Sequence, residues 1–442
     1  MKSVAVLSIL LLATSPALGQ QSETPAPPAQ PAQSSAEPTA AATAAPPSKA
    51  PELPPLAPTT SRSPTIKLGG YLHADGRLFF EKGDAVAPID DFLIRRARPD
   101  ITVKAGDFVG RLLTDFGGGK PAVQDAYVEW RPAAYAALRF GKYKPPVGLE
   151  RLQSANGIWF VERALPTNLV PNRDIGLQLS GEIARTVTYA LAVVDGAPDL
   201  GNIDGDVNRN KELAGRVFVR PFAPTRNAWL EGLGFGVSGS DGITRGSAKA
   251  PDVGAYKTDG QSTFFAYRAD SKAPSAGNTV VADGERKRWS AHASYYGTPV
   301  GVQAEYVLVE HHLALDTTRK TLRNTAWQVA GTVVLTGERV LESGVVPARP
   351  VDEGGLGAVQ LTARYASLEI DRDTFPTFAD PTTSARKAAT WSAGVNWSLS
   401  SVVRLEVDFA RTWFAGGNKD ANGNVIPRPE ERVVLSRVLF AF

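Results

Sequence analysis

The chain has 442 residues and a formal net charge of +3, with 41 glycines, 33 prolines and no cysteine. This length suits two or three soluble domains or one large barrel. The small net charge, with neither a basic tract nor an aromatic platform, argues against a nucleic-acid partner, and the lack of cysteine excludes disulfides, thiolate metal sites and a cysteine nucleophile.

Residues 1–19 have the features of a secretory signal peptide. Lys2 precedes an apolar run over 4–13, and small residues at 17–19 precede the expected cleavage site. The apolar run is too short to span a bilayer as a helix. We therefore expect an exported chain.

Residues 20–64 consist mainly of Pro, Ala, Ser, Thr and Gln. Such a composition buries too little apolar surface to offset the entropy of ordering. We expect a disordered tether here, followed by one folded domain over 65–442.

From residue 66 onward, apolar and polar residues alternate in runs of about ten, which is typical of β-strands. In the run 92–105, Leu93, Ala97 and Ile101 fall on one face, and Arg96 and Arg98 fall on the other. The strands predicted in this way are 66–80, 92–105, 107–116, 122–130, 135–143, 174–181, 186–194, 211–220, 230–240, 286–297, 299–310, 321–336, 355–370, 386–398, 401–413 and 430–442.

The links between these strands alternate between short turns and long polar segments, as in bacterial outer-membrane barrels. The long segments are 81–91, 144–173, 195–210, 241–284, 311–320, 371–385 and 415–429, whereas 337–354 is a long link on the short-turn side. A charged face on every strand fits a membrane barrel, because each backbone group must be paired within the bilayer. The predicted fold class is all-β, a transmembrane antiparallel barrel of about sixteen strands.

The segment 144–173 is unusually long for a link inside a folded domain. Its cations are Lys144, Arg151, Arg163 and Arg173, and its apolar residues include Leu149, Ile158, Trp159, Phe160 and Leu165. A solvated loop has little use for such apolar side chains. We expect a packed loop that folds into the pore and carries its cations with it.

A barrel of this size can enclose an aqueous channel lined by the polar faces of its strands. The cations on the inward parity are Arg96, Arg98, Lys104, Arg111, Arg139, Arg216, Arg220, Arg286, Arg288, Arg364, Arg404 and Arg437. The inward acids are Asp100, Asp115, Asp125, Glu129, Glu305, Glu406 and Asp408. Pairing with an acid explains any single arginine best, but the set as a whole favours attraction of anions.

Five segments are informative when taken together: RFGKYKPPVGLERLQS (139–154), IWFVERALPTNLVPNRDIGLQLSG (158–181), FLIRRARPDITVKAGDF (92–108), LTGE (335–338) and LTARYASLEI (361–370). In their order and spacing they resemble the phosphate-selective porin O/P family. The resemblance implies a sixteen-stranded barrel, usually trimeric, whose third outer loop enters the pore. It further implies an arginine ladder that leads anions to a constriction lined by Lys and Arg, with phosphate or polyphosphate as cargo. On this basis Lys142 joins the cations of 139–173 as a candidate.

These considerations predict passive diffusion of small anions, phosphate or polyphosphate, through the outer membrane of a Gram-negative bacterium. The candidate anion-binding residues are Arg96, Arg98, Lys104, Arg111, Arg139, Lys142, Lys144, Arg151, Arg163, Arg173, Arg216, Arg220 and Arg364. No cofactor or metal is implied, and the expected partners are small anions, outer-membrane lipid and two further copies of the chain in a homotrimer.

Two alternatives remain open. One is a general porin with a weak preference for anions. The more remote one is a lipase-like barrel enzyme, which would need a serine and a histidine in contact; His292 lies two residues from both Ser290 and Ser294. The adjacent His311 and His312 are expected to form a solvated loop pair rather than a metal site.

Overall fold

The computed structural model describes residues 63–80, 89–205, 209–225, 227 and 229–442. The chain divides into a unit Met1–Thr59 and a unit Thr60–Phe442. The predicted signal peptide at 1–19, and all but the last two residues of the predicted tether at 20–64, lie outside the described residues. The account below concerns the second unit.

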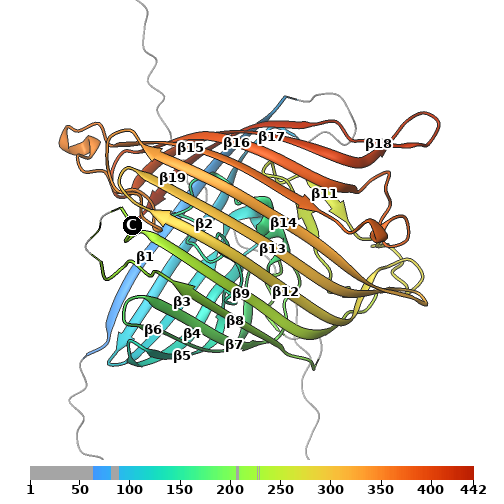
Figure 1. Cartoon of the computed structure of the whole chain (residues 1–442), viewed down its shortest axis with the longest axis horizontal. Helices are drawn as coiled ribbons and strands as arrows, with labels where there is room; N and C mark the ends of the chain where they lie inside the picture. The colour runs from blue at the N-terminus through green and yellow to red at the C-terminus, as the bar shows by residue number, and fades with distance from the viewer. Residues whose placement is uncertain (1–62, 81–88, 206–208, 226, 228) are drawn as a thin grey trace, which may run out of the picture. The chain divides into compact units, whose positions relative to one another are not determined.

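In the described part of this unit, sixteen strands form a closed antiparallel barrel (Figure 1). Each strand pairs with its neighbours in the barrel, and the first strand pairs with both the second and the last, which closes the sheet. The strands are β1 (Thr65–Phe79), β2 (Asp91–Ala105), β3 (Phe108–Asp115), β4 (Ala122–Ala133), β5 (Ala136–Tyr143), β6 (Asp174–Ile183), β7 (Val187–Val194), β8 (Glu212–Val219), β9 (Leu233–Arg245), β12 (Val281–Tyr296), β13 (Val300–Leu315), β14 (Thr318–Val334), β15 (Ala358–Glu369), β16 (Ala385–Ser398), β17 (Val403–Lys419) and β19 (Glu431–Ala441). The predicted fold class is confirmed.

The remaining elements are short. The strands β10 (Ala255–Lys257) and β11 (Thr263–Ala266) pair with each other outside the barrel, and β18 (Val425–Pro427) extends the β17 hairpin. The 3-10 helices are η1 (Gly117–Gly119), η2 (Leu165–Leu169), η3 (Val351–Glu353) and η4 (Arg372–Thr374). None of the helices in the described residues has the length and apolar character needed to cross a bilayer.

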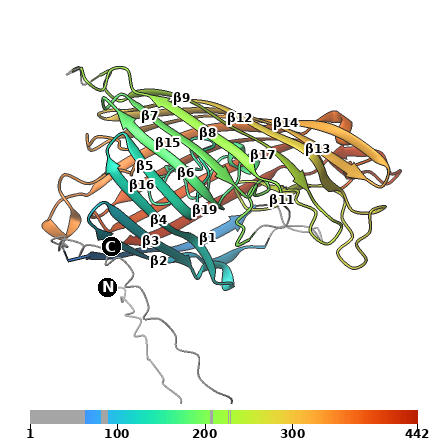
Figure 2. The ribbon, with the colours of Figure 1, turned by 90° about the horizontal axis from the view of Figure 1, so that it is seen from below.

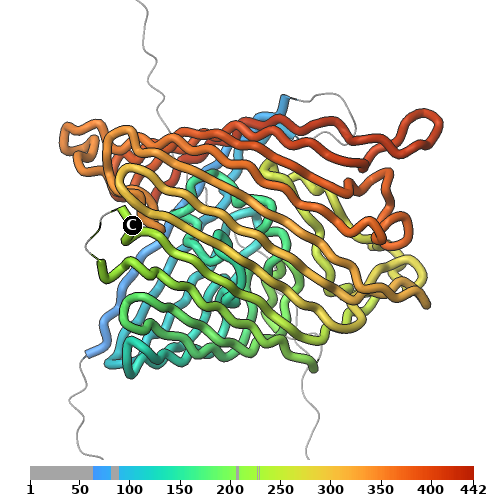
Figure 3. The backbone as a smooth tube through the Cα atoms, viewed as in Figure 1, coloured from blue at the N-terminus to red at the C-terminus, as the bar shows by residue number. Residues whose placement is uncertain are grey.

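The two sides of the barrel differ in strand length. The strands β3, β5, β7 and β8 have 8 residues each, whereas β12, β13, β14 and β17 have 16 or 17. Figure 2 shows β5 to β9 side by side, and in Figure 3 the yellow-to-red hairpins extend well beyond the green ones. The prediction of a long link at 311–320 is wrong, because β13 and β14 continue to Leu315 and from Thr318. Their ends are rich in polar residues, and this composition resembles that of a loop.

Side chains alternate between the two faces of the wall as expected. Large apolar residues on the outward face are exposed, among them Trp130, Phe140 and Trp289, while the inward face is polar and buried. Leu93 is an exception to the predicted parity. A register shift between β1 and β2 skips Arg95 and pairs Leu93 with Asp75. Asp75 faces inward, because it accepts from the buried Arg437. Residues paired across neighbouring strands point to the same face, so Leu93 also faces inward.

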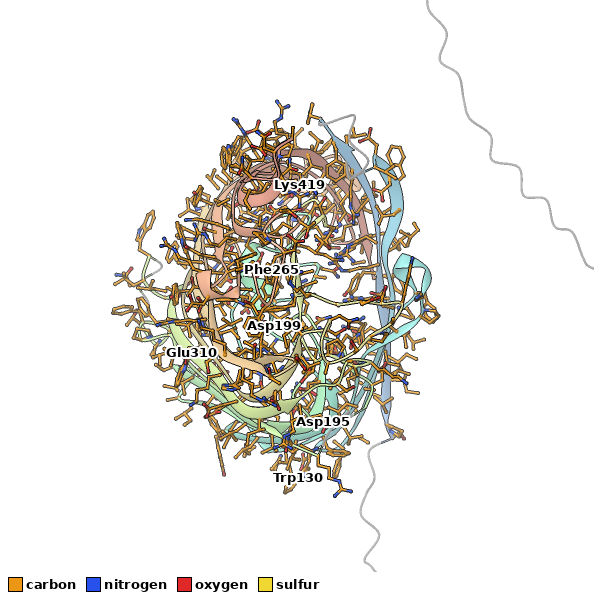
Figure 4. The ribbon with its side chains drawn as sticks, turned by 90° about the vertical axis from the view of Figure 1, so that its right-hand side faces the viewer. Trp130, Asp195, Asp199, Phe265, Glu310 and Lys419 are labelled. Carbon is orange, nitrogen blue, oxygen red and sulfur yellow. The ribbon has the colours of Figure 1, made fainter. Side chains whose placement is uncertain are left out.

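The apolar residues of segment 144–173 are packed, as predicted. Leu149, Ile158, Trp159, Phe160 and Leu165 are each at most 3% exposed. The η2 residues join a core cluster with inward residues of β13, β14 and β15 and with aromatic residues of the 246–280 link. Figure 4 is a view along the barrel. It shows one of these aromatic residues, Phe265, inside the ring of strands, and Trp130 outside the ring.

Candidate functional site

A cavity of about 550 Å³ lies against one side of the barrel interior. Its walls are inward side chains of strands β1 to β8 on one side and the segment 144–173 on the other. Ten cations line it, namely Arg95, Arg96, Arg98, Arg111, Arg139, Lys144, Arg151, Arg163, Arg173 and Arg216, but only two acids, Asp115 and Asp125. Such an imbalance in a partly enclosed space concentrates anions.

Nine of the thirteen residues predicted to bind anions line this cavity, and four do not. Lys104 and Arg220 are exposed near the short-turn ends of β2 and β8. Lys142 is buried and pairs with Asp204, away from the cavity. Arg364 faces inward but lies on the opposite side of the barrel.

Six of the lining arginines are held by carboxylates. Arg98 Nε donates to Asp115 at 2.7 Å, Arg139 Nη2 lies 2.6 Å from Glu129, and Arg173 Nε donates to Asp125 at 2.7 Å. The other three arginines are Arg111, which pairs with Asp100 and Asp125, and Arg95 and Arg96, which both pair with Glu162. These arginines keep only part of their charge available to a passing ion.

Three cations of the segment 144–173 form a different group, which we call the loop cation cluster: Lys144, Arg151 and Arg163. Within the described residues, none of them has a carboxylate oxygen within the 4.0 Å of an ion pair. They donate to backbone carbonyls instead. Lys144 Nζ and Arg163 Nη2 both reach the Gln153 carbonyl, at 2.6 and 2.8 Å, and Arg151 Nη2 reaches that of Thr167 at 2.7 Å.

The cluster is electrostatically strained. Burial, and then the nearby cations Arg173 and Arg163, lower the pKa of Lys144 well below its usual value. Burial and the neighbouring Arg163 also lower the pKa of Arg151. An anion placed among these groups would relieve the repulsion, so the arrangement favours a bound negative charge.

The strand β8 supplies a fourth lining cation without an ion pair in the described residues, Arg216. Its guanidinium lies 4.8 Å from the Phe218 ring centroid, and its Nε atom has no hydrogen-bond partner. It therefore faces the cavity with its charge unneutralised.

The far side of segment 144–173 is fixed to the opposite wall. The amide of Leu149 donates to Glu305 of β13 at 2.7 Å, and the amide of Gly148 donates to Ser238 of β9 at 2.9 Å. Asn396 of β16 donates to the Trp159 carbonyl at 2.8 Å. These bonds span the barrel interior and position the loop cation cluster.

Arg364 of β15 belongs to this support. Its guanidinium lies 2.7 Å from Asp259 and 3.5 Å from Glu150, donates to the Glu162 carbonyl and stacks 4.1 Å from the Phe160 centroid. It is buried and away from the cavity, so its prediction as a pore-lining residue is not matched by its position. Alternation alone identified its inward face but not its partners.

One cation that lines the cavity, Arg95, was not predicted from the sequence. Arg95 occupies the bulge that shifts the β1–β2 register, so both it and Arg96 face inward and contact Glu162. Strict alternation would place it on the outward face. Two adjacent arginines in a membrane strand are the signal in the sequence, since one of them would otherwise face lipid.

The histidines take no part in the cavity. The Ser290 hydroxyl and the His292 ring nitrogen Nδ1 lie 3.3 Å apart on β12, and His292 has no carboxylate partner in the described residues. The expectation of a solvated loop pair at His311 and His312 is wrong. Both lie on β13, with His311 buried against Thr244 and His312 bonded to Thr321.

The fold has solved counterparts among outer-membrane channels. The outer membrane channel DcaP of Acinetobacter baumannii aligns with a TM-score of 0.52 and 12% identity, covering 86% of this chain and 97% of that one. An anion-selective porin from Comamonas acidovorans aligns with a TM-score of 0.50 and 11% identity, covering 86% of this chain and all of that one. The barrel and these counterparts define the fold class, that of an outer-membrane β-barrel channel.

Comparison of the sequence identifies the family within this class. The family model for phosphate-selective porin O and P matches residues 66–426, and the chain belongs to this family. It is 24% identical over 389 residues to Porin O of Pseudomonas aeruginosa, an alignment that covers 83% of this chain and 86% of that protein. The resemblance found in the sequence is confirmed.

Proposed function

We propose that the protein is an anion-selective pore whose preferred cargo is phosphate. The observation that carries the proposal is the loop cation cluster. Arg151 is buried and Lys144 and Arg163 are half-buried beside the cavity, and none of the three has an ion-pair partner in the described residues. A structural arginine or lysine ordinarily has a carboxylate partner when buried. A cluster without one suits a mobile anion as its counter-charge.

The proposed path runs along the β1–β8 wall. The paired arginines, such as Arg98 and Arg139, keep partial positive charge and draw the ion inward, and the loop cation cluster with Arg216 forms the narrow part. In this proposal the segment 144–173 constricts the pore, which its bonds to Glu305 and Asn396 on the opposite wall support. Backbone-anchored cations bind an ion without immobilising it, which passage requires.

Phosphate is the proposed cargo for two reasons. Arginine forks match the paired oxygens of phosphate, and the family carries phosphate selectivity in its name. An anion-selective porin is also among the structural counterparts. Polyphosphate is a longer cargo with the same chemistry. The competing proposal is a general pore with a weak anion preference, because several inward acids remain.

We further propose that the barrel sits in lipid as a homotrimer, exported by the signal peptide at 1–19. Exposed outward residues such as Phe140, Leu191 and Trp289 support contact with lipid or with another copy.

The test is single-channel recording in a planar bilayer under a KCl gradient, followed by addition of phosphate. We expect a reversal potential on the chloride side and a block of the chloride current by phosphate. Anion preference without phosphate block would favour the general porin. A cation preference would contradict the proposal as a whole.

A further inference from the structure

Four cavity-lining residues have a buried polar atom without a hydrogen-bond partner in the described residues. Three of these atoms can donate: Nε of Arg151, Nε of Arg216 and the hydroxyl of Tyr143. The fourth is an acceptor, Oε1 of Gln124. A chloride ion can accept hydrogen bonds from donors of this kind, but it has no hydrogen to donate to the Gln124 acceptor.

A bulge places Gln124 in this position. The β3–β4 register shifts between Leu113 and Thr114, so Gln124 is the extra residue on β4 next to Asp125. Both residues are 5% exposed and both line the cavity. Bulges often redirect a side chain beside a functional site. Here the bulge adds an amide to a wall that already holds a carboxylate.

Three other acceptor side chains in the cavity wall, those of Asp115, Asp125 and Asn172, are occupied. Asp115 Oδ1 accepts from the amides of Ala97 and Gly117, and its Oδ2 accepts from Arg98. Asp125 pairs with Arg173 and Arg111 through its two oxygens. Asn172 Oδ1 accepts from Arg151 and Arg173. The Gln124 amide, by contrast, turns about a broad terminal torsion and can present Oε1 to the cavity.

We infer that Gln124 is a specificity-determining residue that accepts a hydrogen bond from a protonated oxyanion. The inference rests on the proposed anion pore and goes one step further, to how the pore tells one oxyanion from another. Hydrogen phosphate and hydrogen arsenate carry an O–H group at neutral pH, whereas sulfate carries none. The cations supply donors to either ion, and Gln124 supplies a contact that needs the proton.

An unpaired buried acceptor penalises the ion that lacks the matching donor. The site is wet and the ion is transient, so one hydrogen bond corresponds to about a three- to tenfold difference in blocking concentration.

The experiment measures the block of chloride current by phosphate, arsenate and sulfate at about pH 8, where phosphate and sulfate both carry nearly two negative charges. For the wild-type pore we expect phosphate and arsenate to block at about three- to tenfold lower concentration than sulfate. In Gln124→Met, which keeps the length of the side chain and removes its amide, the three ions should block at similar concentrations.

Gln178→Met is the matched control, because Gln178 also lines the cavity, from β6, but has no orphaned buried atom. It should keep the difference between phosphate and sulfate. A chloride current in each variant shows that the barrel has folded.

Equal block by phosphate and sulfate in the wild-type pore, or an unchanged difference in Gln124→Met, would overturn the role of Gln124 while leaving an anion-selective pore intact. A cation-selective reversal potential in KCl would instead remove the proposed function on which the inference rests. The two failures are therefore distinguishable.

Discussion

The two walls of the barrel interior use the same residue type in different ways. On the wall formed by β12 to β17 and β19, the arginines Arg288, Arg364 and Arg437 are buried and each contacts at least two carboxylates. On the β1–β8 wall and the loop that faces it, the arginines line a cavity, and Arg151, Arg163 and Arg216 lack an ion pair in the described residues.

The local supply of carboxylates, and not the inward direction of the side chain, therefore determines whether an arginine is neutralised or lines the cavity. Where loops bring Asp199, Asp259 and Glu162 against the wall, these carboxylates neutralise the wall arginines and side chains fill the interior. Where the loop brings cations against a wall that is already basic, space and net charge remain. A pore can be confined to one side of a wide barrel in this way.

Replacing Arg364 should give the largest effect, on stability. In Arg364→Met, the buried carboxylates of Asp259 and Glu150 lose their partner, which we expect to cost about 3–5 kcal/mol. Thermal unfolding in detergent measures this loss. Ion selectivity in the folded fraction should change little, and a large selectivity change without destabilisation would place Arg364 in the pore after all.

Leu169→Ala tests the apolar side of the same wall. Leu169 is fully buried in the core cluster between the loop and β12–β16, so the cavity left by truncation should cost about 2–5 kcal/mol. Denaturation in detergent reports the change. The exposed Leu356→Ala, on the 337–354 link side, is the control and should be nearly neutral.

Lys144 makes anion preference depend on pH. Its lowered pKa means that its charge is lost at a lower pH than that of an ordinary lysine, so anion preference should fall as the pH rises through a range below the usual pKa of lysine. Losing one charge at about 6 Å in water weakens attraction by roughly 0.7 kcal/mol, or about threefold. The measurement is the reversal potential across this pH range. It should change with pH in the wild type and stay nearly constant in Lys144→Arg, because arginine stays charged.

Lys142→Met should have the smallest effect. Lys142 was predicted to bind anions but pairs with Asp204 outside the cavity. We expect the reversal potential to stay within the error of the wild-type value. A clear loss of anion preference would show that the path runs behind β5 and not along the cavity.

The barrel itself was predictable because alternation is imposed on every strand by lipid on one face and polar groups on the other. Alternation fails locally where the backbone adds a residue. It misplaced Leu93 and missed Arg95 at one bulge, and it gave no sign that Gln124 and Asp125 would both face the cavity. It also led to a predicted end of β13 that is too early, because the polar residues before Leu315 resemble a loop.

The site was predictable only in part, for a different reason. The cations of 144–173 could be recognised from their number within a long, partly apolar segment. Which of them keep a free charge depends on contacts between residues distant in sequence, such as Arg173 with Asp125 and Arg364 with Asp259. No local pattern encodes such pairs, so the sequence could not separate Arg151 from Arg364.

The most direct test of the central claim is the reversal potential of Arg151→Glu in a KCl gradient, beside Arg372→Glu as an exposed control on η4. The substitution changes the charge of the loop cation cluster by two units, which at about 6 Å in water corresponds to roughly 1.4 kcal/mol, or about tenfold in the ratio of chloride to potassium permeability. We predict a tenfold loss of anion preference in Arg151→Glu and none in the control. Equal reversal potentials in both variants and the wild type would contradict the claim that this cluster selects the ion.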